Sequence, residues 1–406
     1  MGRFYLDLAG GEFTGEPMQG INTAIKRMAL GLVTALPLMG IGLCQAEEGV
    51  KPDFRYLPAV MSPRVERALL LDLARADGRM VAVGERGFII YSDDDGQSWS
   101  QAQVPVSVTL TAVSFPTPKM GWAVGHEGTI LHSADGGSSW SVQLSGQEVA
   151  SQEVSLAEGL IEQMQQQLET ADELDLEDLQ YALDDAQYAL EDAQEAVASG
   201  GTPNPFLDVW FADEKTGIAV GAYGLFFRTK DSGEHWTIAS AALDNPDKYH
   251  YYSLSSPNGR IVYMSGEAGM LFRSEDEGAT WVRLESPYEG SFFGILAQPN
   301  GANGRVVTFG LRGNIFVSND RGDSWEERTT ENENTLMGGS LTADGRLVIV
   351  GRSGTVLSSD DGGENFSVLY RDDRGSYGAV ITGSDGNLIV VGEGGIHHAG
   401  PDGSSR

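Results

Sequence analysis

The sequence predicts an all-β fold, a seven-bladed β-propeller with an inserted antiparallel α-helical hairpin. Three observations predict it: a Gly-x-x-Gly turn that occurs seven times, a second turn motif that follows six of these turns, and one long interval with helical spacing. Successive turns begin about 41 to 45 residues apart, except in the interval between Gly125 and Gly221. A period near 40 residues is typical of propellers and solenoids.

Each Gly-x-x-Gly turn lies between two short apolar segments, as 80–83 and 88–91 show around the first turn. Two β-rich segments joined by a short glycine turn indicate a hairpin, so each repeat should form a small antiparallel sheet. The 53 glycines of the chain agree with a fold that has many tight turns. The seven turns begin at Gly84, Gly125, Gly221, Gly266, Gly310, Gly351 and Gly392.

The second turn motif is Ser/Thr-x-Asp-x-Gly-x-x-Trp/Phe, an Asp-box, which in the first repeat comprises Ser92, Asp94, Gly96 and Trp99. The aspartate can accept backbone N–H bonds inside the turn, the glycine permits a positive φ, and the aromatic ring can fill the gap beside the next blade. We therefore expect structural roles for six aspartates: Asp94, Asp135, Asp231, Asp276, Asp320 and Asp361.

The seventh repeat, 377–400, has three apolar segments and no Asp-box. We expect the segment 54–61 to supply its fourth strand, because a closed ring leaves no open sheet edge.

The repeat as a whole resembles the photosystem II stability/assembly-factor family of Asp-box (BNR) propellers, most strongly over 109–140 and in total over roughly 70 to 397. This resemblance implies a seven-bladed, non-enzymatic assembly factor on the lumenal or periplasmic side of a membrane, bound to a membrane-protein client. The non-photosynthetic bacterial branch of the family implies an envelope complex as partner, with an exporter as one example.

The N-terminal residues 1–46 resemble a leader and signal peptide, in which Lys26 and Arg27 precede the apolar run 28–43. Cleavage after Ala46 would leave 47–406 as the propeller, located in the periplasm and not spanning a membrane. A lipid anchor at Cys44 is the alternative, although Leu43 is bulky for such a site.

The insertion 148–204, between the second and third blades, has 15 acidic residues and no Lys, Arg or His. Its apolar residues step by three and four in two runs, which predicts two helices joined near 169–173. The hairpin could be self-packed with a solvated acidic surface, or it could be a docking arm. In the second case Leu183 and Leu190 are candidate contacts, because two helices alone bury little apolar surface.

The hairpin should rise from the same face as the Gly-x-x-Gly turns, because that turn and the connection to the next blade lie at the same end of a propeller blade. Arg86, Arg312 and Arg352 lie in these turns and are the candidate partner-binding residues, with solvated turn residues as the alternative. The other turns carry acidic or uncharged residues. A sparse arginine patch of this kind argues against a photosystem client.

The composition excludes some functions. A net charge of −31 would repel nucleic acid. Asp-boxes also occur in sialidases, so a carbohydrate-active enzyme of sialidase type is the alternative function, although the arginine cluster and Tyr–Glu pair of such enzymes are not evident. We expect no catalytic residue, metal or cofactor, since His397 and His398 are adjacent in a strand and point to opposite faces. The sequence sets neither the client nor the oligomeric state.

Overall fold

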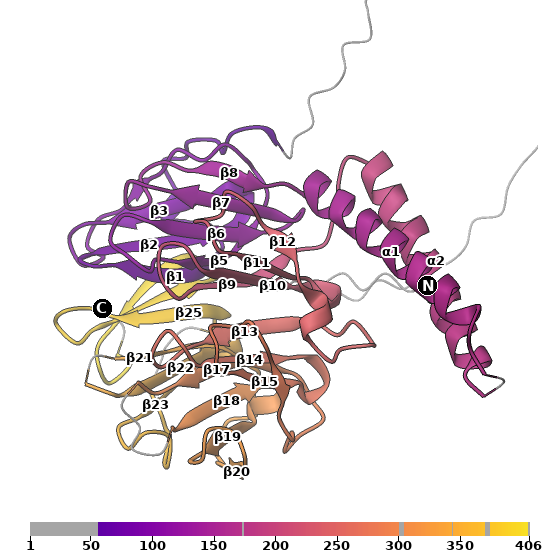
Figure 1. Cartoon of the computed structure of the whole chain (residues 1–406). Coiled ribbons are helices and arrows are strands. Elements are labelled where there is room, and N and C mark those ends of the chain that lie inside the picture. Colours follow the sequence, from indigo (N-terminus) through magenta and orange to yellow (C-terminus); the bar gives the residue numbers. More distant parts are fainter. Residues whose placement is uncertain (1–55, 173, 300–303, 343, 370–373, 405–406) are drawn as a thin grey trace, which may run out of the picture. The chain divides into compact units, whose positions relative to one another are not determined.

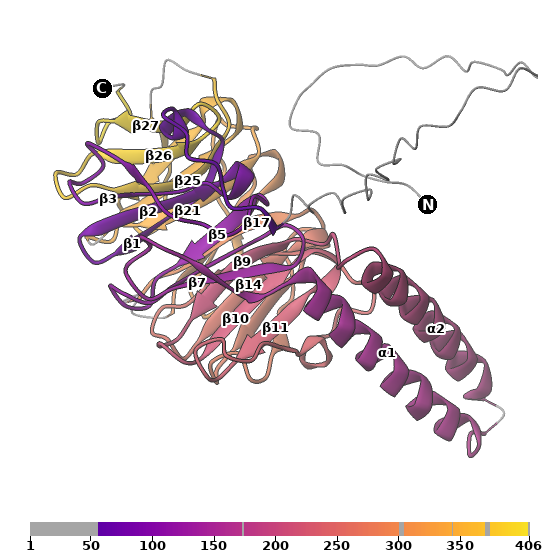
Figure 2. The same ribbon diagram turned by 90° about the horizontal axis from the view of Figure 1, so that it is seen from above.

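The computed structural model describes residues 56–404, except 173, 300–303, 343 and 370–373. Seven antiparallel sheets follow one another along the chain, and within each sheet the strands are neighbours in sequence order (Figure 1). The first strand of each sheet packs against the first strands of the sheets before and after it, from β1 through β25 and back to β1 (Figure 2). This closed ring confirms the predicted seven-bladed propeller. The leader, with Cys44, lies outside the described residues.

The first six sheets have four strands each, and the seventh has three among the described residues. Sheets one to four consist of β1 (Leu70–Ala76), β2 (Arg79–Gly84), β3 (Ile89–Ser92), β4 (Ser100–Gln101); β5 (Leu110–Ser114), β6 (Gly121–Gly125), β7 (Thr129–Ser133), β8 (Ser141–Leu144); β9 (Phe206–Phe211), β10 (Gly217–Gly221), β11 (Phe226–Thr229), β12 (Thr237–Ile238); and β13 (Tyr251–Ser255), β14 (Val262–Gly266), β15 (Leu271–Ser274), β16 (Val282–Arg283). Sheets five to seven consist of β17 (Phe292–Ala297), β18 (Val306–Gly310), β19 (Ile315–Ser318), β20 (Glu326–Glu327); β21 (Leu336–Leu341), β22 (Leu347–Gly351), β23 (Val356–Ser359), β24 (Ser367–Val368); and β25 (Tyr377–Thr382), β26 (Leu388–Gly392), β27 (Gly395–Ala399).

The hydrophobic core lies between neighbouring sheets, where apolar side chains from one blade pack on the next. Between the second and third blades the rings of Trp122 and Phe211 stack with centroids 3.6 Å apart, and Trp236 of the third Asp-box meets Phe211 edge-on at 5.8 Å. Large aromatic side chains suit this position because they bury much apolar surface in a gap that widens away from the ring axis. The Asp-box aromatic residue thus contributes to blade packing.

The ring closes differently from the sequence expectation. The described part of 54–61, residues 56–61, forms no strand, and Phe54 and Arg55 lie outside the described residues. The N–H of Ala59 donates to Val104 O at 3.0 Å, just after β4 on the outer edge of the first sheet. Pro58 has no N–H to give to a ladder, which disfavours a regular strand here. The expectation that this segment pairs with the seventh sheet was therefore wrong for the residues described.

Closure instead uses the same blade-to-blade packing as the rest of the ring. Val65, in the short 3-10 helix η2 (Val65–Arg67), is buried with Leu70 of the first blade and Ile389 of the seventh. At the Asp-box face, Arg75 donates to Thr382 O at 2.6 Å, and Asp95 Oδ2 accepts from the N–H of Ser384 at 2.6 Å. Apolar burial and these hydrogen bonds together seal the first blade to the last.

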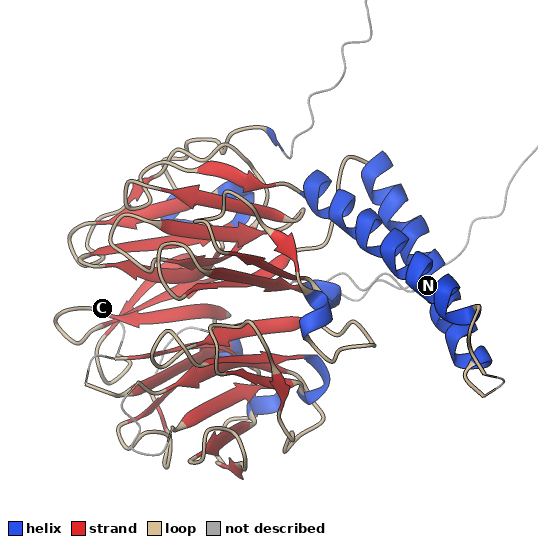
Figure 3. Cartoon of the chain, in the orientation of Figure 1, coloured by secondary structure: helices blue, strands red, loops and turns tan. Residues whose placement is uncertain are grey.

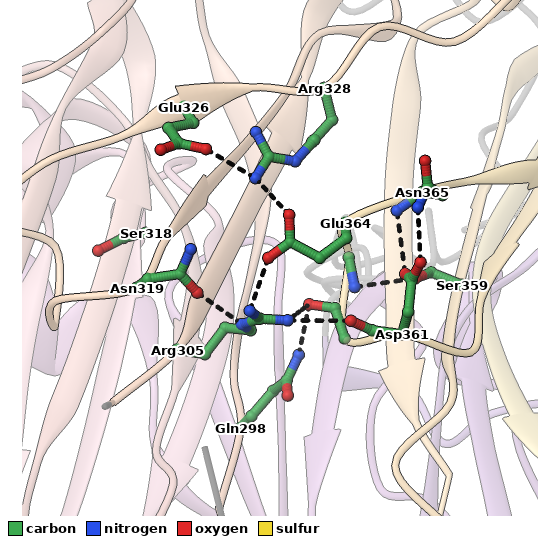
Figure 4. A network of polar contacts seen from close by, with 12 residues as sticks. Gln298, Arg305, Ser318, Asn319, Glu326, Arg328, Ser359, Asp361, Glu364 and Asn365 are labelled. Carbon is green, nitrogen blue, oxygen red and sulfur yellow. Dashed lines mark hydrogen bonds and ion pairs between the residues drawn. The ribbon is translucent and has the colours of Figure 1, made fainter. Parts of the chain in front are cut away.

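Arginines on the Asp-box face join several other pairs of blades in the same way. Arg305, just before β18 of the fifth blade, donates to Glu364 Oε1 at 2.6 Å and to Asp361 O at 2.9 Å in the Asp-box turn of the sixth (Figure 4). The second carboxylate oxygen of Glu364 accepts from Arg328 at 2.7 Å. Charge-assisted bonds of this kind are stronger than neutral ones and fix one blade against the next. These arginines are therefore occupied within the ring.

The insertion forms the predicted hairpin of α1 (Gly146–Leu168) and α2 (Leu176–Ala198), which lie side by side and project away from the ring (Figure 1 and Figure 2). A capping box begins α1: Ser145 Oγ accepts from the Glu148 N–H, and the Glu148 carboxylate accepts from the Ser145 N–H at 2.9 Å. This reciprocal pair satisfies two N–H groups that the first turn leaves without helical partners. The helix therefore starts at a defined point on the ring.

Candidate functional site

The Gly-x-x-Gly turns and the base of the hairpin meet on one face of the ring. The Gly128 N–H, in the turn of the second blade, donates to Asn204 O at 2.9 Å, where the chain returns from the hairpin. A Cβ on Gly128 would lie 2.8 Å from the Thr202 side chain and 3.0 Å from the Gly146 backbone. The hairpin leaves the sheets at the same end as several of these turns (Figure 3). We refer to this end of the ring, defined by the seven turns, as the Gly-x-x-Gly face.

The hairpin is held to this face by burial as well as by its cap. Val149 and Ala150, in the first turns of α1, have no exposed surface, and Val149 joins the core between the second and third blades. The side-chain amide of Gln152 then makes two hydrogen bonds to the backbone at β12: Nε2 donates to Trp236 O, just before the strand, at 2.8 Å, and Oε1 accepts from the Ile238 N–H in it at 3.0 Å. A helix anchored through its first two turns extends from the ring in a fixed direction.

The third position of six of the turns holds a non-glycine residue with φ between 51° and 58°. This left-handed conformation costs an L-residue on the order of 1 kcal/mol, so the surrounding turn must enforce it. The six side chains are thereby held at fixed points around the face. The residues are Arg86, Glu127, Tyr223, Ala268, Arg312 and Ser353.

The three predicted arginines lie on this face and are exposed. Arg86, in η3 (Glu85–Gly87), is 77% exposed and lies 3.8 Å from Glu85 Oε2. Arg312, in η7 (Leu311–Gly313), and Arg352, in η8 (Arg352–Gly354), have no ion-pair partner among the described side chains. Arg352 occupies the second position of its turn, so it is displaced by one residue from the other two. The arginines come from the first, fifth and sixth blades and do not form one cluster.

The start of every inner strand carries a β-bulge that sequence reasoning missed. Each bulge leaves one half-exposed residue unpaired, beside the first glycine of the turn and next to the ring axis. A bulge re-aims the side chain of its extra residue, and in six of the seven blades that residue has a side chain beside the mouth of the ring, whereas the seventh blade has a glycine there. They are Leu71, Thr111, Leu207, Tyr252, Phe293, Met337 and Gly378.

An aromatic cluster occupies this mouth over the third to fifth blades. The rings of Tyr252 and Phe293 lie 4.8 Å apart, and those of Tyr223 and His250 also lie 4.8 Å apart. Tyr223 lies in η4 (Ala222–Gly224) and is 55% exposed. Half-exposed aromatic rings offer rigid apolar contacts with a polar edge, which suits protein recognition. The aromatic run 249–252 in the sequence indicates the start of an inner strand, with a surface contact as the alternative, and no sequence signal marked Tyr223 or Phe293.

The predicted hairpin contacts are packed inside the hairpin. Leu183 is 7% exposed and Leu190 is half-buried, with Ala186 and Ala193 of α2 also buried. Because the apolar seam of α2 is filled by α1, Leu183 cannot contact a partner while the hairpin is closed. Its direct role is to hold the two helices together, and a docking role must therefore fall to the exposed surface of the hairpin.

The six Asp-box carboxylates are saturated by their own turns. In the first box, Asp94 Oδ1 accepts from the Ser98 N–H at 2.8 Å and Oδ2 accepts from Ser98 Oγ at 2.6 Å. These bonds lower the pKa of Asp94 to about 2, since they favour the charged form. The same pattern recurs at Asp135, Asp231, Asp276, Asp320 and Asp361. These oxygens are engaged in folding contacts.

Two carboxyl groups lie in the inner strands, near the ring axis. Asp72 Oδ2 accepts from the Val113 N–H at 2.8 Å, and Asp208 Oδ2 accepts from the Leu254 N–H at 2.6 Å, so each ties its inner strand to that of the next blade. Burial raises the pKa of Asp208 to about 8, and the charge of Asp72 adds to this shift. No group of three His, Cys, Asp or Glu side chains suited to a metal ion occurs among the described residues.

A family model for the photosynthesis system II assembly factor YCF48 matches residues 93–159 and 193–348, more than half of the chain. The chain belongs to this family. The gap between the two matched segments, 160–192, falls within the hairpin. Membership groups the chain with assembly factors and not with enzymes, against the sialidase-type alternative.

A curated relative, the photosystem II assembly lipoprotein Ycf48 of Synechococcus sp. (strain CC9902), is 32% identical over 131 residues. The match spans 32% of this chain and 38% of that protein, which is less than two thirds of its length.

Two solved structures share the fold. One, of YCF48 bound to D1 peptide, has a TM-score of 0.56 at 17% identity and covers 84% of this chain and 97% of that one. The WD40 β-propeller domain of Doa1 has a TM-score of 0.54 at 11% identity, over 85% of this chain and 95% of that one. Neither described helix, α1 or α2, has a stretch that is apolar enough to cross a membrane.

Proposed function

We propose that the protein is a non-enzymatic scaffold or assembly factor of a bacterial envelope, which binds a membrane protein of a larger complex through its Gly-x-x-Gly face and hairpin. The observation that carries this proposal is the difference between the two faces of the ring. On the Asp-box face, arginines and aspartates are consumed by bonds within and between blades. On the Gly-x-x-Gly face, arginines and aromatic rings are exposed beside a rigidly anchored arm.

Family membership supports the same role. The relative in Synechococcus is named an assembly lipoprotein, and a YCF48 structure contains a bound peptide of D1. A ring that displays fixed loops suits recognition of a protein segment. The diluted arginines, one in each of only three turns, favour a client other than a photosystem, such as a component of an exporter.

We further propose that 1–46 directs export, with 47–406 as the periplasmic propeller and 148–204 as its inserted arm. Either cleavage after Ala46 or lipid attachment at Cys44 places the propeller outside the cytoplasm. The Synechococcus relative is a lipoprotein by name, which supports lipid attachment at Cys44 as the alternative to test. Intact mass of the mature N-terminus distinguishes the two: a diacylglyceryl group on Cys44 indicates an anchor, and a chain beginning at Glu47 indicates simple cleavage.

The test of the function is crosslinked capture from envelope membranes, with the client measured by mass spectrometry. One variant replaces 160–186 by a short Gly/Ser turn, which keeps the buried root of α1 intact. A second carries Arg86→Glu, Arg312→Glu and Arg352→Glu. We expect each to reduce capture of one dominant membrane protein, the second by roughly tenfold, because charges at a binding face steer association.

The matched control carries Lys119→Glu, Lys215→Glu and Lys230→Glu, three exposed lysines on the Asp-box side, with the same change in net charge. Capture by this control should stay near that of the parent protein. Equal losses in both charge variants would place binding elsewhere and refute the proposal for the Gly-x-x-Gly face. Capture that is unchanged in every variant would reject both the face and the hairpin.

A further inference from the structure

The tip of the hairpin contains a shallow groove of about 560 Å³ between the end of α1 and the start of α2. The half-buried side chains of Ala171, Leu179 and Ala182 lie in it, and the exposed carboxylates of Asp175 and Asp178 lie at its edge. Two small alanines leave room where the helices end, so the seam that Leu183 fills further along α2 is open at the tip. An apolar surface with a charged edge is the usual form of a groove that accepts an amphipathic helix.

Exposed leucines extend this apolar surface beyond the groove. Leu174, in the turn between the helices, is 91% exposed, and Leu176 at the start of α2 is 40% exposed. A leucine is not favoured over a polar residue at a solvated turn, because its side chain gains nothing there from burial. Its contact surface is available at the point of the hairpin most distant along the helices from the ring.

The negative charge of the hairpin favours a positively charged binding partner for the groove. The insertion has no basic residue, and at the tip Glu169, Asp172 and Glu177 join the two aspartates of the groove edge. None of these five carboxylates has an ion-pair partner among the described side chains. A second copy of this chain would bring the same acidic hairpin and a net charge of −31, and an anionic lipid surface would also be repelled.

We infer that the hairpin tip binds a cationic amphipathic helix, a Lys- or Arg-rich segment of the membrane-protein partner with one apolar face. The apolar face would cover Leu174 and Leu179, and basic residues would pair with Asp175 and Asp178. This inference rests on the proposed function and specifies its partner as a membrane protein that exposes such a segment on the periplasmic side. The anchored base of α1 holds the tip away from the ring, so one client could contact the tip and the Gly-x-x-Gly face together.

The experiment uses the full chain and three synthetic fluorescent peptides, with binding measured by anisotropy at physiological salt. One peptide has Lys and Leu in a helical amphipathic pattern, the second has the same composition in an order without an apolar face, and the third replaces every Lys by Glu. We expect the amphipathic basic peptide to bind, and the other two peptides to bind much more weakly. Hydrogen exchange with bound peptide should show protection confined to 170–182 and the adjacent tip.

Two matched variants locate the charge. Asp175→Asn with Asp178→Asn should weaken the amphipathic basic peptide about fivefold to tenfold, since exposed ion pairs contribute little singly and add at neighbouring positions. Glu191→Gln with Asp192→Asn removes the same charge from exposed positions further along α2, and should change binding less than about twofold because of screening. Ala182→Met, which fills the groove without changing charge, should also weaken binding.

Several results would overturn the inference: absence of binding, equal binding of the two basic peptides, or equal losses in the two charge variants. Equal binding of both basic peptides would mean unspecific attraction to an acidic surface. Client capture by the shortened hairpin separates this failure from that of the proposed function. If capture still depends on the hairpin while the peptide does not bind the tip, the proposed function stands and only the occupant of the groove is wrong.

Discussion

The anchor of the hairpin can be tested at Gln152. Its side-chain amide makes two hydrogen bonds to the backbone of 236–238, and Gln152→Ala would remove both and leave Trp236 O and the Ile238 N–H without their partners. Losing a partner costs a buried polar group about 1 to 3 kcal/mol, and the lower value applies here because both bonds are only partly buried. The two together amount to about 2 kcal/mol, which corresponds to roughly a 30-fold rise in the opening equilibrium of the hairpin base.

Native-state hydrogen exchange measures this opening directly. In Gln152→Ala, amides of 149–157 and of β12 should exchange roughly 30-fold faster, while amides of β22 and β26 on distant blades keep their rates. Gln163→Ala is the matched control, since Gln163 is exposed on the same helix and has no side-chain hydrogen bond among the described residues. If the two variants exchanged alike at the base of α1, the amide of Gln152 would not anchor the hairpin, and its fixed direction would need another cause.

Three further predictions concern the ring. Relative to the parent protein, Asp208→Asn should have a higher melting temperature, by an amount that grows from pH 5 to pH 8. The pKa of Asp208 is about 8 in the folded chain and near 4 when unfolded, so the native state holds one more proton than the unfolded state in this window. The stability of the parent protein therefore falls as pH rises, whereas that of the variant does not depend on this group. A difference between the two proteins that does not vary with pH would contradict this assignment. Gly313→Ala should lower the free energy of unfolding in urea by about 2 to 4 kcal/mol, because its Cβ would lie 2.2 Å from Asn332 O at a φ of 75°. The control Gly345→Ala, at a φ of 89° with open space around it, should lower this free energy by only about 1 kcal/mol. Equal losses in the two variants would show that the close approach to Asn332 is unimportant. Asp95→Asn, which keeps a side chain suited to positive φ, should cost about 1 kcal/mol by weakening the closure to Ser384, and unchanged unfolding would remove this contact from the closure.

The sequence predicts the blades well because each repeat carries its own local chemistry. The Asp-box at Asp94 and the turn at Gly84 need only a few neighbouring residues to form, so a pattern in one dimension is enough. The same holds for the two helices of the hairpin, of which α1 begins with a capping box. Chain topology then places the hairpin and the Gly-x-x-Gly turns on one face without any knowledge of contacts.

The repeat pattern of the sequence does not reveal contacts between residues that are distant along the chain. Arg75 bonds Thr382 O and Asp95 bonds the Ser384 N–H to close the ring, and nothing in their local sequence marks them for this role. The closing strand expected at 54–61 is absent from the described residues 56–61. Helical spacing identified Leu183 as apolar but not the surface that covers it. The bulge that presents Tyr252 at the mouth of the ring arises from pairing with β14, which an apolar run cannot reveal.

The central claim, that partners bind the Gly-x-x-Gly face and the hairpin, is tested most directly by photocrosslinking in cells of the native organism. A photoreactive amino acid would replace Ser353 on that face, Leu174 at the hairpin tip, or Lys230 on the Asp-box side, each of which is exposed. We expect the first two positions to crosslink the same membrane protein and the third to give none. Crosslinks to that protein from Lys230, without crosslinks from Ser353 and Leu174, would place the binding surface on the opposite face and contradict the claim.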